Sequence, residues 1–357
     1  MIKPGLSNYA LIIDLLKDPD RKSLLRIAKE IVLLTFYHRS LPQHYFSRYL
    51  FKKGVTNVKD YFPSAFLYNL KSFFNDKEVI EVLENKLYFD FYYGQFSVSL
   101  PRILMYNHKN IFVFKNSSFA INSAQDFKSI LEQIFNQNPS YDSIMIKRTY
   151  GSYGGRKIFK LFRNQLNTYP GIISELYTEV IKAGFLFQET VIQHPELNRL
   201  NPSCLNTIRF DTFIGTDGKI EIISGYIRMS ISNYHVDNVS SGGVFVGINL
   251  ENGRLKKYGY SSFRKFGTKV LIAHPVTNTV FEDFSIPFFG QAKELVIKAA
   301  SFMPGLRLVG WDMGIGESGP VLIEGNSDYE IAGNDLADGG YRANPVFRKV
   351  LAEIDFL

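Results

Sequence analysis

Two short apolar segments near the C-terminus constrain the fold more than any other feature. Residues 310–315 and 321–326 are separated by a Gly-Pro turn, a pattern that predicts two β-strands joined by a turn. Side chains two positions apart share one face of a strand, so Glu324 and Asn326 point the same way, and antiparallel pairing could bring Asp312 beside them. Three oxygen ligands of this kind suit Mg²⁺. The alternative is a set of polar residues on the wet face of an ordinary hairpin.

The overall composition indicates a globular protein of two or three packed subdomains. The chain has 357 residues, of which 45% are hydrophobic and 21% charged. The net charge of +7 favours anionic partners. Because the lysines and arginines are spread along the chain without a long basic run, we do not expect nucleic acid to be a partner.

The chain contains one cysteine, Cys204, which excludes an internal disulfide framework and a cysteine-based zinc site. The first residues lack the pattern of a signal peptide, and no apolar run reaches the roughly 18 residues that a membrane span needs. We therefore expect a cytoplasmic protein, with peripheral membrane association left open.

Residues 1–83 are expected to form a helical N-terminal region. Apolar residues recur at helical spacing in residues 20–38, and further helices are predicted for residues 44–53, for residues 60–74 and from residue 76 onwards. Basic and aromatic residues alternate between positions 48 and 53. This pattern fits either a contact with a membrane or an acidic partner, or a half-buried helix with snorkelling lysines.

Residues 84–140 and 141–195 are expected to form an N-terminal lobe and a lid. The predicted elements are a helix from Lys86 to Gly94, strands at 97–105 and 110–115, a helix at 123–135, strands at 143–149 and 157–161, a helix at 172–183 and a strand at 185–189.

A glycine-rich turn joins the strands at 143–149 and 157–161. Its residues Gly151, Ser152, Gly154 and Gly155 would let backbone N–H groups close over phosphate oxygens, with Lys147 supplying a fixed positive charge. The turn lacks the GKS or GKT of a P-loop. The alternative is an ordinary hairpin turn.

Residues 196–357 are expected to form a C-terminal lobe with strands at 205–213, 220–229 and 243–250, followed by the hairpin described above. Two of these strands carry an arginine, Arg209 and Arg228. A buried arginine is costly unless it is paired, so each must face solvent, an acid or an anionic ligand. Residues 335–341 are expected to be a flexible polar loop.

The order of these features resembles the ATP-grasp superfamily. Several segments resemble, more narrowly, the sugar-transfer associated ATP-grasp family: NPSCLNTIRFDTF, YIRMS, the VDNVSSGG run at 236–243 and GWDMGIGESGPVLIEGN. The resemblance extends from about residue 60 to the C-terminus. It implies an α+β fold in which two lobes clasp ATP, here preceded by the helical N-terminal region.

The resemblance also implies roles for residues along the chain. Lys86 and Lys147 would contact the ATP phosphates under the glycine-rich turn, and Gln188 and Glu189 would end the interlobe strand, where Glu189 meets the adenine. Glu196, seven residues further on, matches the acid that binds the ribose hydroxyls.

Asp312, Glu324 and Asn326 match the family's Mg²⁺ ligands, with Glu324 bridging two ions. One departure is Gly310, because many relatives place an arginine two residues before the first metal acid. The catalytic role of that arginine would then fall to Arg228 or Arg209.

The resemblance implies an ATP-dependent carboxylate-amine ligase that acts through an acylphosphate. We expect a small-molecule or glycan carboxylate and an amine as substrates, the acid belonging to a sugar, a nucleotide sugar or a surface polysaccharide. Two alternatives stay open: a phosphotransferase that stops at a phosphorylated product, and a non-catalytic nucleotide-binding module in polysaccharide synthesis. The N-terminal helices are expected to contact a membrane or a polysaccharide assembly, if they have a partner.

Overall fold

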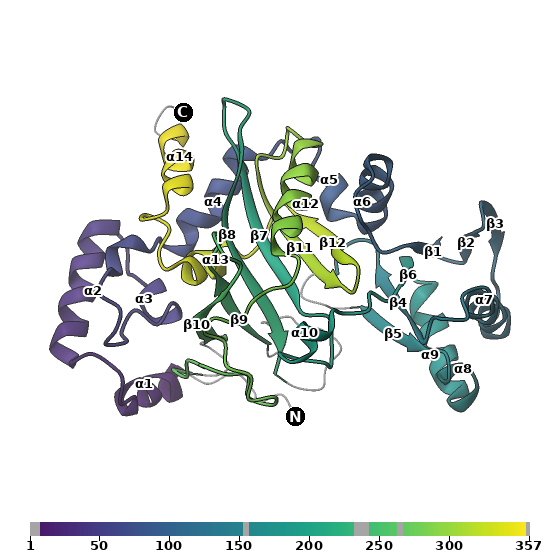
Figure 1. Cartoon of the computed structure of the whole chain (residues 1–357), viewed down its shortest axis with the longest axis horizontal. Helices are drawn as coiled ribbons and strands as arrows, with labels where there is room; N and C mark the ends of the chain where they lie inside the picture. Colours follow the sequence, from purple (N-terminus) through teal and green to yellow (C-terminus); the bar gives the residue numbers. More distant parts are fainter. Residues whose placement is uncertain (1–7, 153–156, 232–242, 263–266, 355–357) are drawn as a thin grey trace.

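The computed structural model describes residues 8–152, 157–231, 243–262 and 267–354. It confirms the α+β class expected from the sequence: helices surround two six-stranded antiparallel sheets. The sheet with the longer strands, built from residues between 207 and 326, is called the larger sheet, and the other is called the smaller sheet. Figure 1 shows the larger sheet in the middle, the N-terminal helices at one end and the lobe of the smaller sheet at the other.

The N-terminal region is helical, as predicted. Its helices are α1 (Asn8–Lys17), α2 (Leu24–His38), α3 (His44–Ser47), the 3-10 helix η1 (Val58–Asp60), α4 (Ser64–Phe74) and α5 (Glu81–Glu84). The helix predicted for residues 44–53 ends at Ser47, because Tyr49 adopts a positive φ of 57°. Tyr49 and Phe51 are buried, so they do not form the exposed aromatic surface that one interpretation of this segment required.

The smaller sheet has the strand order β3-β2-β1-β6-β4-β5. Its elements, with the helices around them, are α6 (Lys86–Tyr93), η2 (Gly94–Phe96), β1 (Ile103–His108), β2 (Ile111–Phe114), β3 (Ser117–Ala120), α7 (Ala124–Gln137), β4 (Ser143–Arg148), β5 (Ile158–Phe162), α8 (Gln165–Thr168), α9 (Pro170–Val180) and β6 (Gly184–Glu189). α7 and α9 pack against one another, and their apolar residues share a core with β6. The strand predicted to begin at residue 97 begins only at Ile103, after Pro101, whose missing N–H cannot join a ladder.

The larger sheet has the strand order β10-β9-β8-β7-β11-β12. Its elements are α10 (Pro195–Asn198), β7 (Thr207–Ile214), β8 (Ile220–Ser230), β9 (Gly243–Ile248), β10 (Leu255–Tyr260), α12 (Phe289–Ser301), β11 (Leu308–Gly316), β12 (Gly319–Asn326), α13 (Ile331–Asp338) and α14 (Pro345–Ile354). The predicted hairpin of residues 310–326 is present as β11 and β12. α12 packs on β7, β8, β11 and β12, and α13 contacts β8 and β9.

The polar stretch at residues 335–341, predicted to be a flexible loop, is ordered by a buried carboxylate. Asp335 lies on α13 with no exposed surface, and its side chain accepts hydrogen bonds from the backbone N–H groups of Phe62 (3.3 Å) and Tyr341 (2.8 Å). Arg48 forms an ion pair with the same carboxylate at 2.9 Å. These contacts hold α13 against the N-terminal helices, so the loop prediction was wrong for residues 335–338, whereas residues 339–341 lie outside helices and strands.

α6 connects the two sheets structurally. Its residues Phe89 and Tyr93 belong to the core of the larger sheet, and the Tyr93 ring lies 5.8 Å from that of Trp311 on β11. At its other end, the backbone N–H of Lys86 donates to the carbonyl of Thr149, just after β4 of the smaller sheet, at 2.8 Å. The start of α6 is therefore held beside the glycine-rich turn. Among the described helices, none has the length and apolar character needed to cross a membrane.

Candidate active site

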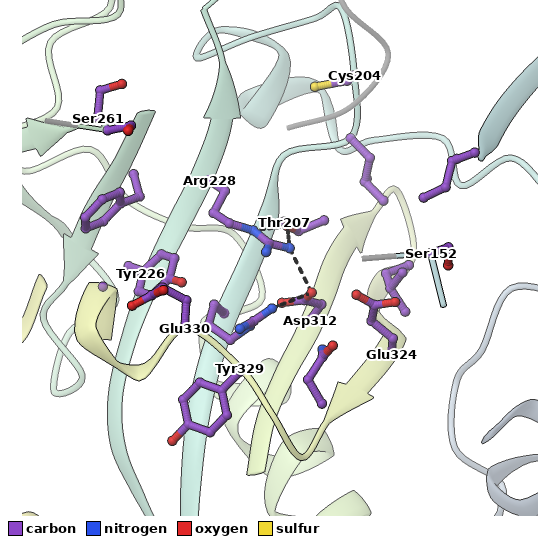
Figure 2. A pocket seen from close by; sticks show the side chains of 18 of the residues that line it. Ser152, Cys204, Thr207, Tyr226, Arg228, Ser261, Asp312, Glu324, Tyr329 and Glu330 are labelled. Carbon is purple, nitrogen blue, oxygen red and sulfur yellow. Dashed lines mark hydrogen bonds and ion pairs between the residues drawn. The ribbon is translucent and has the colours of Figure 1, made fainter. Parts of the chain in front are cut away.

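The β11–β12 hairpin places two carboxylates side by side. Asp312 and Glu324 are direct cross-strand partners, and their carboxyl groups lie close enough to hydrogen-bond. The register shifts between Asp312 and Met313, so β12 carries one extra residue there, a β-bulge of the kind that re-aims side chains near functional sites. Both carboxylates line a cavity of about 2530 Å³. Figure 2 shows them pointing into it from neighbouring strands.

Two arginines on adjacent strands hold Asp312. Arg209 on β7 faces Asp312 in the strand register and donates from Nη2 to Oδ2 at 2.8 Å. Arg228 on β8 reaches the same oxygen with its Nη2 at 2.9 Å, and its Nε donates to Thr207 Oγ1 at 3.0 Å, as drawn in Figure 2. Burial raises the pKa of Asp312, but the two guanidinium groups outweigh it and hold that pKa below its usual range. Asp312 is therefore ionised.

Gly310 has no room for an arginine side chain, the residue that the family resemblance would lead us to expect here. A Cβ added there would lie 2.5 Å from Cγ of Tyr329, whose ring fills the space over the strand. The guanidinium of Arg209 lies 5.8 Å from the centre of that ring. Cationic charge thus reaches Asp312 from β7 and β8 instead of from β11.

The third predicted metal ligand lies two residues beyond Glu324. Asn326 faces Gly310 across the hairpin and lines the cavity, and its buried Nδ2 atom has no hydrogen-bond partner among the described residues. No group of three or more His, Cys, Asp or Glu side chains is arranged as a metal site among the described residues. Two carboxylates and an amide nevertheless fit Mg²⁺, which commonly takes one or two carboxylates and completes its shell with water and phosphate.

Two lysines approach the carboxylates from the other side of the cavity. Lys86 Nζ lies 2.6 Å from a carboxylate oxygen of Glu324, and this ion pair outweighs burial and raises the pKa of Lys86. Lys147 on β4 is almost fully buried, and burial together with the nearby Lys86 lowers its pKa, opposed by Asp90 and Glu324. Four basic side chains therefore surround Asp312 and Glu324, and the centre of the cavity carries an excess of positive charge.

Asp90 on α6 is a site residue that the sequence analysis missed. Both of its carboxylate oxygens accept from Gln188 Nε2 at 3.0 Å, and its charge acts on Lys147 and Lys86. Burial raises its pKa to about 7 against the opposing effect of these three groups. A signal was present, since Asp90 follows Lys86 by four positions on a predicted helix and so shares its face.

The first two residues of the glycine-rich turn line the same cavity as this cluster. Gly151 has a φ of 70°, which favours glycine, and both Gly151 and Ser152 line the cavity. Ser152 Oγ donates to the carbonyl of Arg148 at 3.2 Å. Gly154 and Gly155 lie outside the described residues, and so do residues 236–242 of the VDNVSSGG run.

The three residues expected near the base and ribose have different surroundings. Glu189 lines the cavity and accepts from the backbone N–H of Arg102 at 3.0 Å and from the Tyr141 hydroxyl. Gln188 is buried against Asp90. The carboxylate of Glu196 is half exposed, pairs with Arg199 at 2.7 Å, and is not among the described residues that line the cavity.

The fold and this site define an ATP-grasp protein. The profile of the family described as sugar-transfer associated ATP-grasp matches residues 66–346. The chain belongs to that family. No curated protein matches it.

Solved structures with a similar fold include three ATP-grasp ligases. D-cycloserine synthetase DcsG is 13% identical over 79% of this chain and 73% of its own, with a TM-score of 0.45. D-alanyl-alanine synthetase A from Vibrio cholerae is 12% identical over 76% and 65%, with a TM-score of 0.42. The VanG D-Ala:D-Ser ligase from Enterococcus faecalis is 11% identical over 75% and 61%, also with a TM-score of 0.42. The chain thus spans less than two thirds of the length of the last two proteins.

Proposed function

We propose that this protein is an ATP-dependent carboxylate-amine ligase that forms an acylphosphate from an acid on a sugar, nucleotide sugar or surface polysaccharide. The observation that carries the proposal is the centre of the cavity, where Lys86, Lys147, Arg209 and Arg228 surround Asp312 and Glu324. The sugar is suggested by the family's description alone.

The charge balance of the cavity suits a nucleotide triphosphate. Lys86 and Lys147, which line the cavity, would bind phosphate oxygens, and the backbone of Gly151 and Ser152 would contact the same phosphates. A bound polyanion would also favour the charged form of Lys147, whose pKa burial lowers. Glu189, at the end of β6, is placed for the base.

Asp312, Glu324 and Asn326 would hold Mg²⁺ through their side-chain oxygens. When bound, the metal would neutralise charge that develops on the transferring phosphoryl group. Lys86, which pairs with Glu324 at 2.6 Å, would contact the phosphates beside it. The buried Nδ2 of Asn326 would find a partner if the amide rotates to present its oxygen to the metal.

The reaction needs positioning and charge more than proton transfer. A carboxylate oxygen of the acceptor attacks the γ-phosphorus, the bond from that phosphorus to the bridging oxygen breaks, and ADP leaves. An amine nitrogen then attacks the acyl carbon, phosphate leaves with the electrons of the C–O bond, and the nitrogen loses a proton to solvent. Arg228, partly exposed beside Asp312, would hold the acceptor carboxylate and the oxyanion, while the more deeply buried Arg209 would orient Asp312.

A hydroxylamine trap tests the proposal. The protein is incubated with Mg²⁺, ATP, hydroxylamine and pools of carboxylic acids that include uronic acids and amino acids, and the products are identified by mass spectrometry. We expect ADP together with a hydroxamate, because hydroxylamine intercepts an acylphosphate. ADP with a stable phosphorylated acceptor and no hydroxamate would instead establish the phosphotransferase alternative.

Two variants make the trap specific to the site. Arg228→Lys keeps a charge but loses the planar fork, so hydroxamate formation should fall by about 10²-fold or more while nucleotide binding is retained. Lys257→Gln, a change at an exposed residue of β10 outside the cavity lining, should leave the rate unchanged. Equal rates for Arg228→Lys and Lys257→Gln would remove Arg228 from the mechanism.

A further inference from the structure

The outer face of α2 is apolar where a solvent-exposed helix is normally polar. Its inner face is buried through Ile27 and Leu34, whereas Leu25, Val32 and Phe36 are 68%, 55% and 80% exposed. These three positions follow the i, i+7, i+11 spacing that aligns side chains on one face of a helix. We call them the α2 stripe. Figure 1 shows α2 at the end of the molecule opposite the smaller sheet, and the exposed fractions of these side chains show that the described residues leave the stripe uncovered.

The same region holds almost all the net charge of the protein. Residues 1–60 contain eleven lysines and arginines against five acidic residues, a net charge of +6 out of the chain's +7. Among the described residues of this region, six basic side chains are exposed but only one acidic side chain, that of Asp20. The exposed basic residues are Lys17, Arg26, Lys29, Arg39, Lys53 and Lys59.

These charges discriminate between partners for the stripe. A second copy of the chain would bring another +6 against the first, which opposes association. An anionic lipid surface attracts basic residues and offers an apolar layer for exposed apolar side chains. An in-plane helix with apolar residues on one face and basic residues beside them is typical of such binding.

Two exposed apolar residues of the same region line the active-site cavity. They are Ile12 on α1 and Leu41 after α2, which are 55% and 76% exposed. The N-terminal region thus borders the cavity that Asp312 also lines.

We propose that the N-terminal helices dock the protein on an anionic membrane surface through the α2 stripe and the surrounding basic residues. Docking in this way would bring the N-terminal region, in which Ile12 and Leu41 line the cavity, close to the lipid and to a membrane-borne acceptor. The proposal concerns binding alone and stands whether or not the ligase chemistry is correct.

Co-sedimentation of the full-length protein with vesicles tests it. We expect the protein to sediment with vesicles of phosphatidylcholine and phosphatidylserine, to bind phosphatidylcholine vesicles much more weakly, and to be released by salt. Replacing Leu25, Val32 and Phe36 by serine should weaken the binding by about a hundredfold or more, since each buried apolar side chain contributes about tenfold or more. Lys29→Gln with Arg39→Gln should weaken it by about fivefold per charge.

Matched variants at the far end of the molecule give the control. Ile111→Ser and Tyr169→Ser also remove exposed apolar side chains, from β2 and from the turn before α9, and should leave vesicle binding unchanged. The proposal is overturned if the wild type does not bind phosphatidylserine vesicles, or if the stripe variant binds as well as the wild type. A wild-type dimer in solution that the stripe variant abolishes would also overturn it, because the stripe would then be a contact between copies.

Discussion

Replacing Asp312 should affect two properties that can be measured separately: the free energy of unfolding and the effect of Mg²⁺ on ATP binding. Asp312 is 2% exposed, and two guanidinium groups converge on it. Asp312→Asn keeps the shape of the side chain but leaves Arg209 and Arg228 without their carboxylate. Breaking a buried ion pair in this way costs about 3–5 kcal/mol, and we expect a loss of that size in the free energy of unfolding.

The same substitution should act on nucleotide binding in the opposite direction. With the carboxylate gone, the positive charge around the phosphates increases, so ATP without Mg²⁺ should bind at least as tightly as it does to the wild type. The additional effect of Mg²⁺ on nucleotide affinity, and turnover itself, should be lost because a metal ligand is missing. Urea denaturation measures the first quantity, and calorimetric titration of ATP with and without Mg²⁺ measures the second.

The double variant Arg209→Met/Asp312→Asn provides the control. It removes one of the two buried guanidinium groups that have lost their carboxylate, so it should regain part of the free energy of unfolding. It should not regain the effect of Mg²⁺ on ATP binding. The reasoning would be refuted if Asp312→Asn cost less than about 1 kcal/mol, or if Mg²⁺ strengthened ATP binding to the variant as it does in the wild type. The first result would mean that the arginines do not depend on Asp312, and the second that Asp312 is not a metal ligand.

Three further changes test other parts of the structure. The pKa of Asp90 is raised to about 7 in the folded protein, above its value of about 4 in the unfolded chain, so the folded state binds a proton more tightly. The free energy of unfolding should therefore decline as the pH rises from about 4 to about 7. Urea denaturation at several pH values should show a smaller decline for Asp90→Asn. Gly310→Ala should destabilise the protein by about 1–3 kcal/mol because the added methyl group clashes with the ring of Tyr329. Gly290→Ala, where a methyl group would meet open space, should leave the melting temperature unchanged or raise it. Equal melting temperatures for the two variants would contradict the clash. Arg48→Met should lower the free energy of unfolding by about 3–5 kcal/mol, because it leaves the buried carboxylate of Asp335 without its ion-pair partner. Arg48→Met/Asp335→Asn should recover most of this loss. A double variant as unstable as the single one would show that the loss comes from packing and not from charge.

The site was predictable where its residues lie on regular, strongly patterned elements. Asp312, Glu324 and Asn326 belong to a hairpin whose apolar alternation and Gly-Pro turn fix its register, and the structure pairs Asp312 with Glu324. The apolar alternation could not reveal the bulge beside them. The sequence indicated that Arg209 and Arg228 need a partner or solvent, but it could not identify Asp312 as that partner. That contact depends on the order of four strands in the sheet.

Other features were not predictable because they depend on long-range contacts. Asp335 resembles a loop residue in its polar surroundings, yet Arg48 and the N–H of Phe62, nearly 300 positions away, hold it in the core. The helix expected through residue 53 fails because Tyr49 and Phe51 pack into the core. In both cases tertiary burial overrides the local pattern.

The ring that covers Gly310 restricts how such a site can change during evolution. An arginine at position 310 would collide with Tyr329, and loss of the ring alone would leave a void beside the buried Arg209. Two substitutions would have to occur together, since each is harmful without the other. An arginine at position 310 and the pair Arg209 and Arg228 are therefore alternative ways of supplying charge to Asp312 that single substitutions do not connect, and a lineage that has adopted one of them is expected to keep it.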